Sequence, residues 1–172
     1  APTVLTERYS LSPQEFGALI GLNGFAFMAA SRLNMIALRT MGPRDVLARY
    51  VGIPVLIAAA LFVVTWLWSV PLWLVIALQL SFFVMVGRVT PNVAALALAP
   101  HGKEAGAASA LMGALQSALA MLNGFAVATF NHGRVSTLAA IMTAGAALTL
   151  MSYLWAAAAP QSQDGLRRND LR

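Results

Sequence analysis

The chain has 172 residues, of which 59% are hydrophobic and only 10% are charged, and its formal net charge is +5. Soluble domains carry about 25% charged residues, so this chain has too few polar side chains to cover the surface of a soluble core. The basic residues are dispersed and lack interleaved aromatic residues, which excludes nucleic acid as a partner. The absence of cysteine excludes disulfides, cysteine-ligated zinc and thiol catalysis. The lipid bilayer is the expected solvent.

Five apolar stretches are long enough to cross a membrane as helices, since a bilayer core of about 30 Å needs about 20 residues at 1.5 Å rise each. A polar cap and a proline at Ser12-Pro13 begin the first stretch, and Gly42-Pro43 ends it. The turns at 69–71 and 131–133 separate later stretches. The predicted spans are 14–38, 46–68, 71–90, 104–130 and 135–159. Residues 1–159 are therefore predicted to form an all-α, polytopic transmembrane helix bundle, followed by a polar tail at 160–172.

The basic residues predict an orientation. The loops after the first, third and fifth spans carry seven Lys and Arg, namely Arg39, Arg44, Arg49, Lys103, Arg167, Arg168 and Arg172. The other side carries two, Arg8 and Arg134. Because basic loops stay inside, we expect an external N-terminus and a cytoplasmic C-terminus. An odd number of spans with an external first end predicts that a further helix precedes them in the complete protein.

No catalytic or metal-binding motif is present. The two histidines, His101 and His132, lie in loops on opposite sides of the predicted membrane, so they do not share a metal, and no H-E-x-x-H, G-x-S-x-G or P-loop occurs. We expect neither an enzyme nor a cofactor. The carboxylates are Glu7, Glu15, Asp45, Glu104, Asp164 and Asp170, all outside the middle of a span. If the complete protein couples to protons, the carboxylate that exchanges them at membrane depth is expected outside this chain.

Several uncharged polar residues lie within the spans. Asn23, Gln79, Gln116 and Asn123 carry amides that are unfavourable in hydrocarbon unless they find polar partners. They are predicted either to line a substrate cavity or to form hydrogen bonds between helices, and both interpretations stay open.

Two further features concern helix packing and bending. Ser109, Gly113 and Ser117 form a row of small residues at four-residue spacing, which favours close helix packing or, alternatively, a sliding surface. Pro91 removes a backbone hydrogen bond near the end of the third span and predicts a hinge there.

Three motifs carry a resemblance to a known family. The run T-P-N-V-A-A-L-A-L-A-P-H-G-K-E-A-G-A-A-S-A-L-M-G-A-L-Q at Thr90–Gln116 resembles the tenth-to-eleventh helix segment of bacterial drug:proton antiporters, in the bicyclomycin- and chloramphenicol-resistance branch of the major facilitator superfamily. Leu11–Gly17 with Leu22-Asn23 resembles the eighth helix, and 31–44 resembles the turn into the ninth. The matches occur in the family's order across about residues 1–130.

The resemblance implies that the chain is helices eight to twelve of a twelve-helix transporter fold in a bacterial inner membrane. It implies part of a proton-coupled efflux transporter for small lipophilic drugs, with the missing N-terminal half, the drug and the proton gradient as partners. Arg39, Gly42, Arg44 and Asp45 resemble the superfamily's gating loop, although an ordinary basic loop explains them as well. Ala107, where the family often has Ser, and Arg32, at a usually neutral position, depart from the pattern.

Two other functions remain open. One is a truncated, non-transporting membrane protein or an assembly partner of another subunit. The other is a metabolite or sugar transporter of the same superfamily. Upstream coding sequence distinguishes the non-transporting protein from a transporter. A transporter needs about six or seven further spans upstream, because alternating access requires two repeats.

Overall fold

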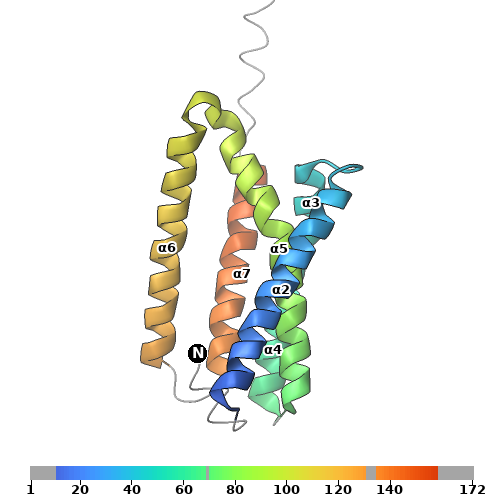
Figure 1. Ribbon diagram of the computed structural model, residues 1–172, viewed down its shortest axis with the longest axis vertical. Coiled ribbons are helices and arrows are strands. Elements are labelled where there is room, and N and C mark those ends of the chain that lie inside the picture. Colours follow the sequence, from blue (N-terminus) through green and yellow to red (C-terminus); the bar gives the residue numbers. More distant parts are fainter. Residues whose placement is uncertain (1–10, 69, 131–134, 159–172) are drawn as a thin grey trace, which may run out of the picture.

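The computed structural model describes residues 11–68, 70–130 and 135–158, and all regular elements in these ranges are helical. They form a bundle of long helices (Figure 1). The prediction of an all-α transmembrane helix bundle is thereby confirmed. The elements are α2 (Pro13–Ala37), α3 (Pro43–Tyr50), α4 (Ile53–Leu67), α5 (Leu72–Leu98), the 3-10 helix η1 (Ala99–Glu104), α6 (Ala105–Phe130) and α7 (Val135–Ala158).

Four helical runs in the described ranges are long and apolar enough to cross a membrane: Pro13–Ala37, Pro43–Leu67, Leu72–Val127 and Val135–Ala158. The third run reverses direction at η1, so that α5 and α6 form a hairpin (Figure 1). Gly102 lies in this reversal with a φ of 26°, which favours a residue without a Cβ atom. The chain is therefore a multi-pass membrane protein. The number of five spans stays a prediction.

Local capping chemistry sets the starts of the first two helices. Ser12 Oγ accepts a hydrogen bond from the Glu15 N–H at 3.2 Å, and the Glu15 carboxylate accepts one from the Ser12 N–H at 2.7 Å. This is a reciprocal capping box. At the start of α3, the Asp45 carboxylate accepts from the Gly42 N–H at 3.3 Å. Glu15 and Asp45 are therefore capping residues.

Two helix boundaries differ from the predicted ones. The predicted span 46–68 corresponds to two helices that begin at Pro43, because a turn at 51–52 separates α3 from α4. The predicted span 71–90 continues through Pro91 to Leu98 as one helix. Proline removes only one backbone donor, and a side chain of α2, described below, replaces it.

The helices meet in two small apolar cores. Leu61 of α4, Val75 of α5 and Ala139 of α7 centre one core, and Leu47 of α3 and Val89 of α5 centre the other. α5 is the central helix, since it packs against α2, α3 and α4, whereas α4 packs along α7. α6 lies beside η1, α7 and α5 and has no buried side chain among those described. The described side chains of α6 are therefore exposed or half-buried.

Candidate functional site

A cavity of about 590 Å³ lies between α5, α6 and α7, with Val51 and Pro54 at the α3–α4 junction contributing to its wall. Most of its lining is apolar. Phe82 and Val86 come from α5, and Met142 comes from α7. A cavity of this size, lined mainly by hydrophobic and aromatic side chains with a few polar groups, is typical of small-molecule sites.

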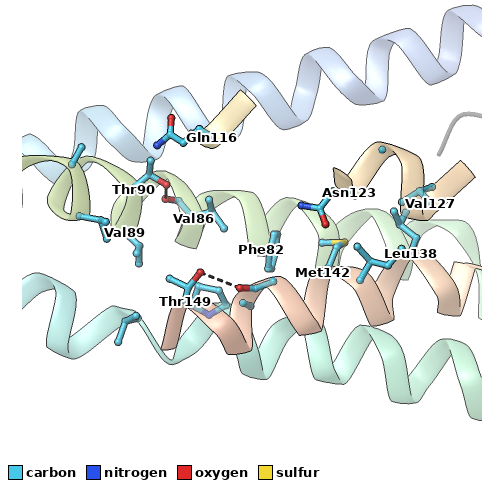
Figure 2. A pocket seen from close by; sticks show the side chains of 18 of the residues that line it. Phe82, Val86, Val89, Thr90, Gln116, Asn123, Val127, Leu138, Met142 and Thr149 are labelled. Atoms are coloured by element: carbon cyan, nitrogen blue, oxygen red, sulfur yellow. Dashed lines mark hydrogen bonds between the residues drawn. The ribbon is translucent and has the colours of Figure 1, made fainter. Parts of the chain in front are cut away.

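Four polar side chains line the cavity, and none of its lining residues is charged. Gln116 and Asn123 project into it from α6 (Figure 2). They are seven residues apart, which places them on one helix face about 10 Å from each other. Thr90 and Thr149 already donate their hydroxyl hydrogens to Val86 O at 2.9 Å and Gly145 O at 3.0 Å. Within the described ranges, the two amides therefore supply the side-chain donors still open to a ligand.

The other two amides predicted from the sequence lie elsewhere. Asn23 on α2 and Gln79 on α5 are half-buried, and neither lines the cavity. Asn23 Oδ1 is buried without a hydrogen-bond partner in the described part of the chain. The structure brings Gln116 and Asn123 together in one cavity and leaves Asn23 and Gln79 outside it. A role for any of the four in substrate binding stays a prediction.

Polar contacts between α2 and α5 were not identified from the sequence. Ser31 Oγ lies 2.9 Å from Gly87 O and donates its hydrogen there or to Phe27 O at 3.0 Å. One turn further along, Asn92 Nδ2 donates to Asn34 Oδ1 at 3.1 Å. Pro91 was the sequence signal for the contact between Ser31 and Gly87. Proline leaves the carbonyl four residues before it, here that of Gly87, without a helical donor.

The α2–α5 contacts form a buried polar seam. Asn34 and Asn92 are 1% and 0% exposed, and Asn92 Nδ2 also donates to Arg88 O at 2.6 Å. The Arg88 guanidinium lies over the Tyr50 ring, 4.6 Å from its centre. This cation–π contact accounts for an arginine within an apolar helix whose Nε has no hydrogen-bond partner in the described ranges.

The residues of the predicted gating loop lie at the α2–α3 connection. Arg39, Gly42, Arg44 and Asp45 are exposed, and Asp45 caps α3 through Gly42. None of the four lines the cavity. Their role in gating stays a prediction.

The predicted packing row of α6 meets no neighbouring helix in the described part of the chain. Ser109, Gly113 and Ser117 are exposed, and a Cβ atom added at Gly113 would have no atom within 4 Å. Packing of this row against a segment outside the described residues stays a prediction.

Comparison with known proteins gives one partial similarity. The chain is 32% identical over 116 residues to an uncharacterized MFS-type transporter, YdgK, of Bacillus subtilis (strain 168), and the match covers 66% of this chain but 28% of that protein. No protein-family model matches the chain. No solved structure matches it either. The chain is thus similar to less than a third of an MFS-type transporter, and its helices are those of a multi-pass membrane protein.

Proposed function

We propose that this chain is part of a proton-coupled efflux transporter of the major facilitator superfamily and that the cavity between α5, α6 and α7 contributes to its site for small lipophilic drugs. The membrane-spanning helices and the similarity to an MFS-type transporter support transport. The substrate class is proposed from the cavity lining, which is uncharged and mainly apolar and includes the exposed amide residues Gln116 and Asn123.

The cavity suits a neutral or weakly polar lipophilic molecule. Phe82 offers an aromatic face, and the flexible side chains of Met112 and Met142 adapt to ligands of different shape. A sugar carries a hydroxyl on nearly every carbon and needs a matching set of buried donors and acceptors. Two amides and two hydroxyls are too few for that, so the lining favours a drug-like molecule over a sugar.

The coupling carboxylate is proposed to lie outside the described residues. Glu15, Asp45 and Glu104 are the carboxylates of the described ranges; all three are exposed and none lines the cavity. A proton exchanged within the membrane needs a carboxylate at membrane depth. Drug added to the purified 172-residue chain in detergent should therefore release no protons. Proton release would place the coupling group within this chain.

The cavity is tested by substitution in the intact transporter. We expect Gln116→Leu and Asn123→Leu to change the relative export rates of drugs by about 2- to 10-fold, because each removes one hydrogen bond worth about 0.5–1.5 kcal/mol. Drugs without polar groups should be exported at least as well. Export from cells with matched expression levels measures this for a panel of lipophilic drugs.

Gln79→Leu is the matched control, since it removes the same amide from a position outside the cavity. It should leave the drug preference unchanged. If Gln79→Leu shifts the preference and the two α6 substitutions do not, the cavity is not the drug site. An intact gene product without further spans would instead favour the assembly-partner function.

A further inference from the structure

α5 crosses Pro91 without ending, which leaves one carbonyl without its helical donor. Proline has no N–H, so the Gly87 carbonyl, four residues earlier, loses the hydrogen bond that a continuous helix would give it. No water is available in a bilayer core to take its place. A helix that bends at proline in a membrane therefore needs a donor from a neighbouring element.

Ser31 of α2 lies within hydrogen-bond distance to supply this donor, in place of its alternative bond to Phe27 O. Its Oγ lies 2.9 Å from the Gly87 carbonyl oxygen. The contact requires α2 and α5 to approach closely, and glycine permits it: a Cβ atom at residue 87 would lie 2.5 Å from Phe27 O and 3.1 Å from the Ala30 Cβ. Pro91 thus leaves the Gly87 carbonyl without a helical donor, and the missing side chain of Gly87 lets α2 approach. The Ser31 hydroxyl then lies where the missing donor would be.

A second bond holds α5 on the other side of the proline. Asn92 Nδ2 donates to Asn34 Oδ1 at 3.1 Å, and both side chains are buried. Ser31 and Asn34 are three residues apart and so share one face of α2. One face of α2 therefore contacts α5 one turn before Pro91, at Gly87, and again at Asn92, directly after it.

The opposite side of the same α5 segment forms part of the cavity wall. Thr90, Val93 and Ala94 line the cavity, and Val93 and Ala94 follow the proline. In Figure 1 the upper part of α5 leans away from its lower part toward α6. The direction that α5 takes after Pro91 therefore sets where this wall lies relative to α6.

We infer that Ser31, supported by Asn34, is a positioning residue: it holds the bend of α5 at Pro91 and so sets the cavity wall at Thr90–Ala94 without touching the cavity. The effect on a substrate rests on the proposed function. The role of Ser31 in holding the bend of α5 does not depend on that function. A distance measurement tests this role without a transport assay.

The chain has no cysteine, so two introduced cysteines take spin labels specifically. Ala97, on α5 beyond Pro91, and Leu56 of α4 are exposed positions on different helices, so the distance between them reports a sideways movement of the end of α5. We expect Ser31→Ala to widen the distance distribution of this pair in lipid nanodiscs. A 20° change of the bend displaces position 97 sideways by about 3 Å, since six residues of helix follow the proline to that point.

Pro91→Ala provides the decisive background, because alanine returns the N–H to the Gly87 carbonyl. There Ser31→Ala should leave the distance distribution unchanged. Ser31→Thr keeps the hydroxyl and should retain the parent distribution in the proline background. Ser152→Ala is the control, since the Ser152 hydroxyl donates to Leu148 O of its own helix at 2.8 Å.

Three outcomes would overturn the inference: an unchanged distribution in Ser31→Ala, equal widening with proline and with alanine at residue 91, or widening in Ser31→Thr as large as in Ser31→Ala. If Ser31→Ala alone fails to fold, the inference requires the double variant with Pro91→Ala to fold as Pro91→Ala does. Failure of that double variant would also overturn it.

Discussion

At the residue scale, Gly87 differs from the other described glycines because α2 packs directly against it. Gly87 is buried, and the backbone of Phe27 occupies the space that a side chain at residue 87 would need. Most other described glycines are different, because a Cβ atom added to them has no atom within 4 Å. The importance of a glycine in this bundle therefore depends on its neighbour on another helix.

Gly87→Ala should destabilise the protein. The new Cβ atom would lie 2.5 Å from Phe27 O, so the two helices must separate. Overpacking of this kind lowers the free energy of unfolding by about 1–3 kcal/mol. Unfolding in detergent, followed by circular dichroism, measures the loss.

Gly113→Ala is the matched control on α6, where a Cβ atom meets nothing within 4 Å. Alanine favours a helix over glycine by up to about 1 kcal/mol, so this variant should be as stable as the parent or slightly more so. Equal destabilisation by both substitutions would show that the α2–α5 crossing is not specially close.

At the scale of elements, α3 is a short helix with two distinct faces. Val46 and Leu47 are buried, whereas Arg44 and Arg49 are exposed. Its start depends on Asp45, which accepts from the Gly42 N–H. α3 therefore joins α2 to α4 through a fixed, basic connection at one end of the bundle.

Gly42→Val tests whether this connection takes part in transport. An added Cβ atom would lie 3.2 Å from Asp45 Oδ2, and the two further methyl groups of valine crowd the cap more. We expect the intact transporter to lose transport several-fold at normal expression, since a lost cap changes helix stability by about 1 kcal/mol. Drug efflux from cells measures this.

Gly52→Val serves as the control, because nothing lies within 4 Å of a Cβ atom at residue 52. Its transport should match that of the parent. Unchanged transport in Gly42→Val would support an ordinary basic loop without a gating role.

At the scale of the whole molecule, the described basic loop residues lie at one end. The α2–α3 and α5–α6 connections share that end, and the α4–α5 connection lies at the other (Figure 1). The first two carry Arg39, Arg44 and Lys103. Because basic loops favour the cytoplasm, we propose that this end is cytoplasmic.

Single cysteines test this orientation. Trp68, at the opposite end, is 64% exposed, and Lys103 is also exposed. In intact cells Trp68→Cys should react with an impermeant thiol reagent, and Lys103→Cys should react only after the membrane is opened. Ser136 is only 7% exposed and is therefore a poor reporter. The reverse labelling pattern would contradict the orientation.

Features that depend on residues close together in the chain follow from the sequence. Long apolar stretches require helices in a bilayer, because every backbone polar group must be satisfied internally. Ser12 with Glu15 fixes the start of α2 through contacts three residues apart, as predicted. These features follow from local chemistry and were accessible without a structure. The start of α3 at Pro43 lies three residues before the predicted one.

The packing of the helices, in contrast, determines which side of each helix faces a neighbouring helix, the cavity or the outside of the bundle. A helix that is apolar all round carries no stripe in its sequence to mark a buried face, so Gln116 and Gln79 look alike until α6 and α5 are placed. The Ser31 contact was hidden for a related reason, since its acceptor is a backbone carbonyl 56 residues away. The cavity and the α2–α5 polar seam both lie between helices that are distant in the sequence. Their residues come together only when the helices pack.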